Sequence, residues 1–422
     1  MDLETMPDHI CIIGAGYVGL PLAMALSEHF ETTVYSHSPG HIAALNEGRD
    51  RTESFTAQEL QETSLRFSDN LEEVAEANIY IVTVPTPVDK EHNPDLTPVR
   101  SATETVASVL KKGDLVIYES TVYVGCTEEF CAPLLAEVSG LEYNRDFFCG
   151  FSPERINPAD KERTIHNVMK IVAGSTPQIT QKMKAVYGSI VDAGIHVAPS
   201  MKVAEASKLL ENIQRDVNIA LMNEVSALFN ALDVDTHDVI EAASTKWNFH
   251  PYYPGLVGGH CISVDPYYLV YNGRQKGVDT PLIEQSRAIN NHMVKHIVDE
   301  TLSLIKKRGI EPKRAAVLFL GVTFKEDCPD IRNSQSVKII NALEKELNEV
   351  DVYDPVVNRE ELLQLYALHS LEHLEHKKYD AVIISVGHSV FKTVAIKEYL
   401  HENGAVLDLK GILPKDQSDF RL

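Results

Sequence analysis

The sequence predicts an α/β protein with two doubly wound, parallel-sheet domains joined by a long central helix. Three observations carry this prediction. Short apolar runs alternate with helical patterns in the first half of the 422-residue chain, an uninterrupted helical pattern follows from Met201 to about Leu232, and the alternation resumes near Ala315. Two parallel strands need a crossover connection, so this alternation indicates β-α-β units.

The first domain is expected over residues 1–199. Its strands are expected at His9–Ile13, Thr33–Tyr35, Ile79–Val84, Leu115–Tyr118 and Phe147–Phe151, followed by Lys170–Ala173 and Ile195–Val197. Helices are expected near Tyr17–Glu28, Pro39–Glu47, Pro98–Lys111 and Thr127–Val138.

The central region, residues 200–309, is expected to start with one long helix. The stretch from Met201 to Leu232 contains no Gly or Pro, and Pro199-Ser200 supplies a start signal. At ~1.5 Å per residue the helix runs on the order of 45 Å, so we expect it to join two domains or to form a dimer interface. A Gly- and Pro-rich loop, Trp247–Asp265, and a second helix, Pro281–Lys307, complete this region.

The C-terminal domain, residues 310–422, is expected to carry a second, smaller α/β sheet. Its strands are expected at Ala315–Leu320, Val350–Tyr353, Ala381–Ser385 and Val406–Leu409.

Charge and apolar pattern argue against two classes of partner. Lys and Arg total 39 against 61 Asp and Glu, for a formal net charge of -22, whereas a nucleic-acid binder needs a basic face. No apolar run approaches the ~18–20 residues that span a bilayer, and Met1–Pro7 lack the features of a signal peptide. We therefore expect a cytoplasmic protein with no nucleic-acid or membrane partner. The six cysteines are scattered and are typical of reduced thiols.

The first expected strand leads directly into Gly14-Ala15-Gly16-Tyr17-Val18-Gly19 and a helix. This G-x-G-x-x-G pattern is typical of a Rossmann-like dinucleotide-binding turn. Gly14 allows the tight turn, Gly16 lets the backbone approach a pyrophosphate, and Gly19 lets helix and strand pack closely. The alternative is a glycine turn that serves packing alone.

The second strand of such a domain usually ends in an acid that binds the adenosine ribose. Here Ser36 follows Tyr35, and Tyr35–Ser38 contains no acid. A 2′-phosphate meets no carboxylate there, so NADP is an alternative to NAD.

Lys208, Asn212 and Arg215 share one face of the long helix, because their spacing is i, i+4, i+7. Two cations and an amide suit a sugar and its phosphates, and a Lys near the reacting carbon can polarise an oxygen. The alternative, which this spacing alone slightly favours, is an ordinary polar face.

The loop Gly255–Asp265 places Cys261 directly after glycines, so a ligand can reach its sulfur. A thiolate attacks aldehydes, and the resulting thiohemiacetal can donate hydride to a nicotinamide. Asp265, four residues on, can orient a cation or a water. The alternative is a small buried Cys in a glycine turn.

Phe324 and Lys325 follow the first expected strand of the C-terminal sheet, and Arg332 comes soon after. Ligands bind beyond the carboxyl ends of such strands, so both cations are placed to meet phosphates. The alternative is an exposed, salt-bridged loop.

His369, His373 and His376 fall in a polar stretch that we expect to be helical. No convergent Cys or carboxylate set accompanies them, so we expect a solvated helix face and no metal site.

Together these segments resemble the UDP-glucose/GDP-mannose dehydrogenase family of nucleotide-sugar 6-dehydrogenases over nearly the whole chain. The motifs are Gly14–Gly19, Val84-Pro85-Thr86-Pro87, Glu119-Ser120-Thr121-Val122, Ser152-Pro153-Glu154-Arg155-Ile156-Asn157-Pro158, Glu205-Ala206-Ser207-Lys208, Gly258-Gly259-His260-Cys261, and Phe324-Lys325 with Asp330-Ile331-Arg332. The nearest resemblance is to the bacterial UDP-N-acetylglucosamine and UDP-N-acetylgalactosamine enzymes of Vi-antigen, O-antigen and capsule biosynthesis.

The resemblance implies an N-terminal NAD domain, a central helix used for homodimerisation and a C-terminal UDP domain. It implies that Cys261 is the nucleophile, that Lys208 with Asn212 stabilises oxyanions and assists proton transfer, and that Asp265, Thr121 and Glu154 serve thioester hydrolysis. The implied cofactor-binding residues are Gly14, Gly16, Tyr17, Val18, Gly19, Thr86, Thr121 and Arg332. The implied substrate-binding residues are Arg155, Ile156, Lys208, Asn212, Arg215, Gly259, Phe324 and Lys325.

Two departures from the family pattern matter. The UDP-glucose enzymes carry a second carboxylate where this chain has Pro158, and an aromatic residue where it has Arg155. That difference favours UDP-N-acetylglucosamine or UDP-N-acetylgalactosamine as the substrate. The other departure is Ser36, where the family commonly has the ribose-binding Asp.

We therefore expect an enzyme that oxidises C6 of a UDP-N-acetylhexosamine to the acid in two NAD-dependent steps, through thiohemiacetal and thioester. UDP-glucose, UDP-N-acetylmannosamine and GDP-mannose are alternative substrates. A dinucleotide-sensing binding protein and a two-electron alcohol dehydrogenase are alternative functions.

Overall fold

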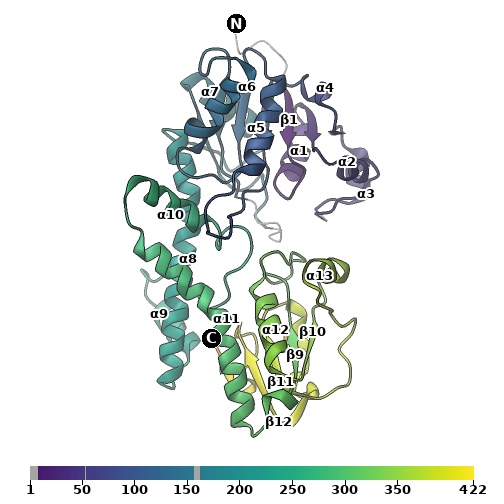
Figure 1. Cartoon of the computed structure of the whole chain (residues 1–422), viewed down its shortest axis with the longest axis vertical. Helices are drawn as coiled ribbons and strands as arrows, with labels where there is room; N and C mark the ends of the chain where they lie inside the picture. The colour runs from purple at the N-terminus through teal and green to yellow at the C-terminus, as the bar shows by residue number, and fades with distance from the viewer. Residues whose placement is uncertain (1–7, 53, 156–161) are drawn as a thin grey trace. The chain divides into compact units, whose positions relative to one another are not determined.

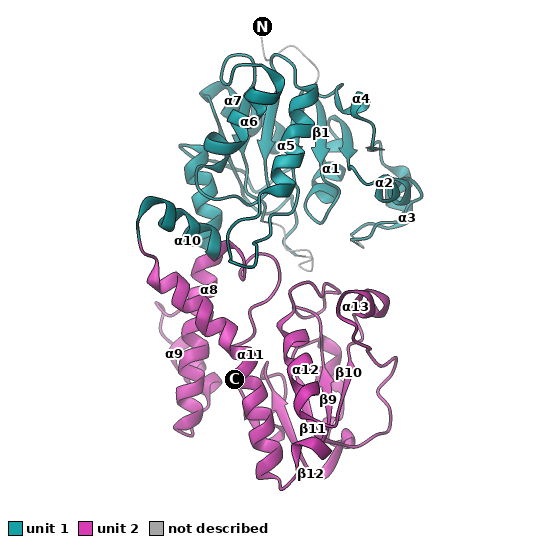
Figure 2. Ribbon diagram, in the orientation of Figure 1, with its two compact units in different colours: residues 1–211, 267–278 teal, residues 212–266, 279–422 magenta. Residues whose placement is uncertain are grey.

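The computed structural model describes residues 8–52, 54–155 and 162–422 (Figure 1). The chain divides into two compact units (Figure 2): unit 1 comprises residues 1–211 and 267–278, and unit 2 comprises residues 212–266 and 279–422. The long helix α8 (Met201–Ala231) contributes to both, because the division falls between Glu211 and Asn212. Within the described ranges, no helix is long and apolar enough to cross a membrane.

Unit 1 is built around a sheet whose described strands run in the order β3-β2-β1-β4-β5-β6-β7-β8. The strands are β1 (His9–Ile13), β2 (Glu31–Tyr35), β3 (Arg66–Ser68), β4 (Ile79–Val82), β5 (Leu115–Tyr118), β6 (Phe148–Phe151), β7 (Lys170–Gly174) and β8 (Ile195–Val197). Neighbouring strands are parallel except β6 and β7, which are antiparallel. The strand order reverses between β1 and β4, where doubly wound sheets bind their ligands.

Helices cover both faces of this sheet (Figure 1). They are α1 (Gly19–Ser27), α2 (Pro39–Asn46), α3 (Ala57–Glu62), α4 (Leu71–Val74), α5 (Thr97–Val109), a π-helical turn (Thr127–Cys131), α6 (Ala132–Ser139), α7 (Pro177–Gly188) and most of α10 (Asp265–Lys276). Alternate residues of one strand enter different cores: Cys11 and Tyr80 pack in one cluster, Ile10 and Ile79 in the other. Burial on both faces explains why these strands read as continuous apolar runs.

Unit 2 contains a parallel sheet whose described strands run in the order β10-β9-β11-β12-β13. The strands are β9 (Ala316–Leu320), β10 (Glu349–Tyr353), β11 (Tyr379–Ile384), β12 (Leu400–Asp408) and β13 (Phe420–Arg421). Its helices, besides its part of α8, are α9 (Thr236–Ser244), α11 (Pro281–Lys307), α12 (Gln335–Glu346) and α13 (Arg359–Tyr366), with 3-10 turns at Pro312–Arg314, Ser389–Thr393, Ile396–Tyr399 and Lys415–Gln417.

The predicted fold class is confirmed, and several elements match residue for residue, including β1, β5, β8 and α11. The helix predicted around His369–His376 is wrong. Helix α13 ends at Tyr366, where Ala367 adopts a left-handed φ of 55°, and the chain continues without regular structure to β11. Leu368 is buried there, and Leu371 and Leu374 pack on the sheet, so core contacts override helix propensity.

Candidate active site

The glycine turn between β1 and α1 has the geometry of a dinucleotide-binding turn. Gly14 has a φ of 114°, and a Cβ on Gly19 would lie 2.0 Å from the Gly14 carbonyl oxygen. A Cβ on Gly16 would meet no atom within 4 Å, so packing alone does not explain that glycine. Tyr17 and Val18 lie half-buried in the turn. The open backbone at residue 16 and the N-terminal N–H groups of α1 fit the pyrophosphate of NAD.

The carboxyl end of β2 carries Ser36 beside this turn. The Ser36 N–H donates to the carbonyl oxygen of Ser68 at 3.2 Å, and the Ser36 hydroxyl accepts from the Ser38 N–H at 3.3 Å. The position that usually holds an acid therefore carries a small hydroxyl, held by its own loop.

Thr86 and Thr121 lie on the loops that follow β4 and β5, at the same sheet edge as the glycine turn. The Ser120 hydroxyl donates to the carbonyl oxygen of Val84 at 2.7 Å and ties the two loops together. The hydroxyl of Tyr268 on α10 donates to the carbonyl oxygen of Thr86 at 3.0 Å. Sequence reasoning missed Tyr268, whose buried position no motif indicates.

The segment after β6 carries Glu154 and Arg155. Glu154 is buried, and Lys208 Nζ of α8 donates to its backbone carbonyl oxygen at 3.0 Å. Arg155 forms an ion pair with Glu211 of α8. The predicted substrate-binding residue Ile156 lies outside the described residues.

A buried ionic cluster lies behind Glu154. Lys170 Nζ of β7 is 2.8 Å from Glu119 Oε2 and 3.1 Å from Glu154 Oε2, and the Tyr187 hydroxyl donates to Glu119 Oε1 at 2.5 Å. Burial raises the pKa of Glu119 to about 7, against the opposing effect of Lys170. Burial opposes the charge of Lys170, but the two carboxylates raise its pKa above the ordinary lysine value. Sequence reasoning quoted Glu119 only as part of a motif and overlooked Lys170 and Tyr187.

The α8 residues Lys208, Asn212 and Arg215 share one helix face as predicted, but that face is not an ordinary solvated one. Lys208 and Asn212 are buried, 7% and 3% exposed. Within unit 2, Asn212 Nδ2 donates to Asp265 Oδ2 at 2.5 Å, and Arg215 donates to Asn212 Oδ1. The interpretation as a polar surface is therefore wrong for Lys208 and Asn212.

The loop before α10 presents Cys261 to solvent, whereas the other five cysteines are buried among the described residues. The interpretation of Cys261 as a small buried residue is therefore wrong. The Asp265 N–H donates to the Cys261 carbonyl oxygen at 2.8 Å, which fixes their spacing. Gly259 has a φ of 76°, and a Cβ there would lie 3.0 Å from the ring of Phe324. Asn333 Nδ2 donates to the Gly259 carbonyl oxygen at 2.9 Å, so the glycines pack the thiol loop onto the loop after β9.

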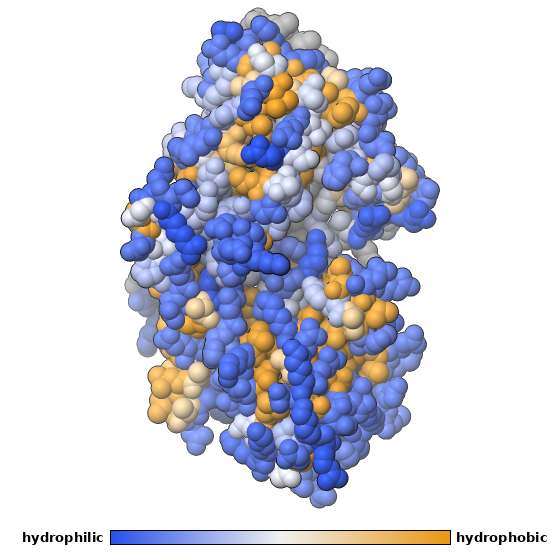
Figure 3. Space-filling view, in the orientation of Figure 1, coloured by the Kyte–Doolittle hydropathy of each residue, from blue (hydrophilic) through white to orange (hydrophobic). Residues whose placement is uncertain are grey.

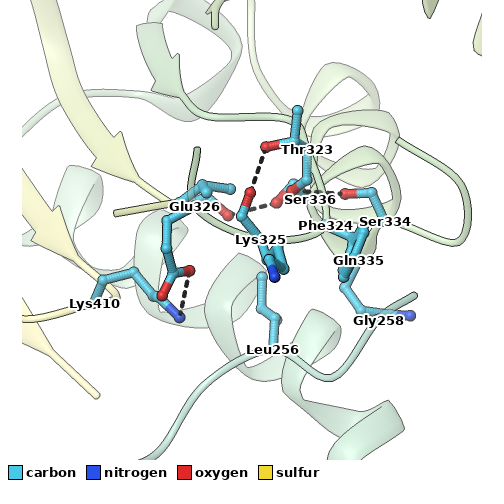
Figure 4. A pocket seen from close by; sticks show the side chains of 12 residues that line it. Leu256, Gly258, Thr323, Phe324, Lys325, Glu326, Ser334, Gln335, Ser336 and Lys410 are labelled. Atoms are coloured by element: carbon cyan, nitrogen blue, oxygen red, sulfur yellow. Dashed lines mark hydrogen bonds and ion pairs between the residues drawn. The ribbon is translucent and has the colours of Figure 1, made fainter. Parts of the chain in front are cut away.

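A pocket of about 310 Å³ lies in unit 2 beyond the carboxyl end of β9 (Figure 4). Its lining residues are Leu256, Gly258, Thr323, Phe324, Lys325, Glu326, Ser334, Gln335, Ser336, Ser385, Val386 and Lys410. Lys325 and Lys410 supply positive charge, and α12 begins here with Ser334 as its N-cap. The Ser334 side chain makes no capping bond, which leaves the N–H groups of the first turn for an anion. Lys410, Ser385 and Ser336 were missed, although Ser385 and Lys410 follow β11 and β12 and the strand-end rule points to them.

Asp354, at the end of β10, organises the loop that carries Phe324 and Lys325. Its Oδ2 accepts from the Val322 N–H at 2.7 Å, the Thr323 N–H at 3.2 Å and His388 Nε2 at 3.0 Å. Burial opposes the Asp354 charge, but these donors lower its pKa below the ordinary value.

Arg332 lies in unit 2 on the same loop, with its guanidinium held by Asp330. Nε donates to Oδ1 at 3.0 Å, and Nη2 donates to Oδ2 at 2.8 Å. His260 Nδ1 lies 3.8 Å from Asp330 Oδ2. Burial, with a further contribution from Arg332, lowers the pKa of His260. Lys325 is therefore the loop cation that faces the pocket, while Arg332 is part of an ion pair, as the salt-bridge alternative expected.

Across the residues that the structure describes, no group of three or more His, Cys, Asp and Glu side chains is arranged to hold a metal ion.

Comparison with known proteins agrees with this geometry. Three models of the UDP-glucose/GDP-mannose dehydrogenase family match the chain: the NAD binding domain over residues 8–191, the central domain over 202–292 and the UDP binding domain over 318–415. A UDP-N-acetyl-D-glucosamine 6-dehydrogenase of Pseudomonas aeruginosa is 46% identical and covers 98% of this chain and 99% of its own length. One of Salmonella typhi is 45% identical over 98% of each chain. Among solved structures, a UDP-D-ManNAc dehydrogenase from Pyrococcus horikoshii superposes with a TM-score of 0.88 at 30% identity, over 98% of this chain and 97% of that one.

Proposed function

Because the chain belongs to the UDP-glucose/GDP-mannose dehydrogenase family, and is thus an NAD-dependent oxidoreductase, we propose that it oxidises C6 of a UDP-N-acetylhexosamine to a carboxylate. The observation that carries the proposal is Cys261, an exposed thiol in a glycine loop next to the hydrogen-bonded pair Asp265 and Asn212. The rest of this proposal concerns which residues perform which step.

In the first oxidation the C6 hydroxyl loses its proton to Lys208 or to a water that Lys208 orders. Bound NAD supplies the hydride acceptor for both oxidations, one cofactor for each. Cys261 Sγ adds to the C6 aldehyde, and loss of the second hydride and a proton leaves a thioester on Cys261. Asp265, Thr121 and Glu154 direct a water to that carbon, the C–S bond breaks, and the sugar acid and a free thiol result. Covalent capture keeps the reactive aldehyde on the enzyme between the two oxidations.

The binding residues divide between the two units. We propose that Gly14–Gly19 and Thr86 hold the dinucleotide, with a contribution from Arg332. The sugar nucleotide is assigned to Phe324, Lys325, Gly259, Arg215 and Arg155, with Ile156 kept as a predicted contact. The pocket at the start of α12 suits the diphosphate, because it combines Lys325 and Lys410 with helix N–H groups.

UDP-N-acetylglucosamine is the favoured substrate, with UDP-N-acetylgalactosamine as its epimer. The two relatives at 46% and 45% identity carry the name UDP-N-acetyl-D-glucosamine 6-dehydrogenase, while the Pyrococcus horikoshii protein that acts on the mannosamine epimer is 30% identical. UDP-N-acetylmannosamine, UDP-glucose and GDP-mannose are the alternatives. NAD is the proposed cofactor, with NADP open because of Ser36. The proposed product is a surface-polysaccharide precursor, for capsule or O-antigen.

A homodimer through α8 is part of the proposal. Val203, Leu210, Leu221, Leu228 and Leu232 are at least 45% exposed, and their helical spacing places them on one side of α8 and its end. Figure 3 shows apolar side chains gathered where α8 ends near α9. An apolar stripe of this kind is typical of a protein interface. The domain limits 1–199, 200–309 and 310–422 are retained as the proposed functional division.

The test is product stoichiometry. Purified protein is given each of the five nucleotide sugars with NAD and with NADP, and reduced cofactor and sugar product are counted. Two reduced cofactors per UDP-N-acetylhexosamine, with an acid as product, is the expected result. One reduced cofactor and an aldehyde would favour the two-electron alternative, and no turnover of any sugar would favour the binding protein.

A Cys261→Ala variant tests the carrying observation. We expect acid formation to fall by about 10³-fold or more, because no thiol captures the aldehyde. Cys126→Ala, in a buried cysteine of unit 1, is the matched control and should retain activity. Acid formation at the normal rate by Cys261→Ala would contradict the proposal.

A further inference from the structure

The Glu119–Lys170–Glu154 cluster is a buried ionic group that the reaction scheme above does not use. Its three side chains come from the loop after β5, strand β7 and the loop after β6. Glu119, Lys170 and Glu154 are 1%, 5% and 7% exposed. Two carboxylates facing one ammonium leave one negative charge unbalanced at a site from which water is largely removed. Such an arrangement is costly unless it serves the chemistry.

The cluster is asymmetric in its hydrogen bonds. Glu119 accepts from Lys170 Nζ at 2.8 Å and from the Tyr187 hydroxyl at 2.5 Å, and both donors belong to the interior of unit 1. Glu154 accepts from Lys170 at 3.1 Å through Oε2 and from the Arg155 N–H at 2.5 Å through Oε1. Its backbone oxygen accepts from Lys208. Glu154 therefore connects the interior cluster to the α8 residue that faces the chemistry.

We propose that Lys170 is a positioning residue that holds the Glu154 carboxylate ionised and oriented to take a proton from the hydrolytic water, while Glu119 carries the proton that the two carboxylates share. The assignment rests on the proposed function, because it concerns the thioester step. In that step the water oxygen bonds to C6, one water proton passes to Glu154 and the C6–Sγ bond breaks. Glu154 then returns its proton to solvent.

Two electrostatic effects act on Glu154 in opposite directions. The Lys170 ammonium favours its ionised form, whereas an ionised Glu119 disfavours it. The other groups that face the cluster are Tyr187 of α7, whose ring lies 5.2 Å from Lys170 Nζ, and Lys208 of α8. Since the carboxylates interact through one cation, their titration belongs to the pair. Glu119, whose pKa is raised to about 7 by burial, stays partly protonated at neutral pH and limits the repulsion.

Two substitutions should therefore shift the pH dependence of hydrolysis in opposite directions. Lys170→Met removes the cation and should move the rising limb of the rate to higher pH, by about one pH unit or more, with an approximately 10²-fold slower reaction at pH 7. Glu119→Gln removes the like charge and should move the limb to lower pH. Its amide can still accept from Lys170 and donate to the Tyr187 hydroxyl. Lys170→Arg keeps the charge and should restore most of the rate.

The measurement is a single turnover with UDP-N-acetylglucosamine and NAD, quenched in acid at a series of pH values. Intact-protein mass spectrometry then follows the decay of the Cys261 adduct. Lys182→Met, in an ion pair with Asp8 at 2.7 Å, and Tyr80→Phe, a buried tyrosine whose hydroxyl donates to a backbone oxygen at 3.1 Å, are the controls. Both should decay as the unaltered enzyme does.

Slow decay in Lys170→Met with the opposite shift in Glu119→Gln supports the assignment. If Lys170→Met does not fold, Glu119→Gln and Lys170→Arg carry the same test. Adducts that decay with one pH dependence in all folded variants overturn the role of Lys170 alone. If the unaltered enzyme forms no Cys261 adduct, the proposed function fails and this assignment fails with it.

Discussion

The two units present two anion sites that are built from different materials. In unit 1 the Gly14–Gly19 turn precedes α1 and contains no charged residue, so backbone N–H groups and the helix dipole are its means of holding a phosphate. In unit 2 the pocket at the start of α12 adds Lys325 and Lys410 to the same kind of helix terminus. One site relies on close backbone approach, the other on charged side chains.

The difference suits the proposed reaction. A dinucleotide has to be exchanged once within each turnover, because each oxidation reduces one cofactor. The sugar nucleotide stays until both oxidations and the hydrolysis are complete. Backbone contacts of modest strength allow exchange, whereas charge-assisted hydrogen bonds from lysines favour retention.

The largest expected effect is at Gly19, with Gly16 as its matched control. Gly19→Ala puts a Cβ 2.0 Å from the Gly14 carbonyl oxygen, so we expect unfolding free energy to fall by about 2 kcal/mol or more. Gly16→Ala meets no protein atom within 4 Å and should change stability by no more than about 0.5 kcal/mol. Because its methyl group occupies the path of the pyrophosphate, KM for NAD should still rise by about tenfold.

Urea denaturation and initial-rate kinetics check this pair. The two glycines separate packing from binding only if stability falls in one variant and cofactor affinity in the other. Equal loss of stability in both variants would show that the turn is closed at residue 16, which would remove the basis for a backbone-bound dinucleotide.

The sheets and the glycine turn were predictable, because buried parallel strands and G-x-G-x-x-G leave direct patterns in the sequence. Short strand β3 and the irregular segment around His369 were not, since both depend on contacts with distant strands. Strand β3 has only three residues, and Leu371 is held by the backbone of Val352 at 2.7 Å.

The candidate site was predictable where chemistry depends on residue type and not where it depends on partners. Cys261, Lys208 and Asp265 were expected from their character and motif positions. Lys170 lies 51 residues from Glu119 in sequence and pairs with it only through the antiparallel β6–β7 contact. No local pattern announces such a pair.

A smaller effect is expected at Lys325. Lys325→Ala removes one of the two pocket cations, so we expect KM for the UDP-sugar to rise by about 10- to 30-fold, the value of a hydrogen bond to a charged group. KM for NAD should stay within about twofold of its original value. Lys313→Ala, whose ammonium group contacts the Lys345 carbonyl oxygen on the outside of unit 2, is the control. Initial rates with each substrate varied in turn provide the values. A rise in both KM values would blur the division of labour between the units.

The smallest effect is expected at Ser36, where the chain differs from the usual acid at the end of the second strand. Ser36→Asp adds a carboxylate beside the adenosine ribose, which repels a 2′-phosphate and can accept from the 2′-hydroxyl. We expect the ratio of kcat/KM with NAD to that with NADP to rise by about threefold to tenfold, a change of roughly 1 kcal/mol. Ser38→Asp, two residues further along the same loop, is the positional control. An unchanged ratio in Ser36→Asp would mean that the ribose is recognised by a group other than residue 36. Cofactor choice would then not follow from the missing acid, and the backbone turn alone would define the dinucleotide site.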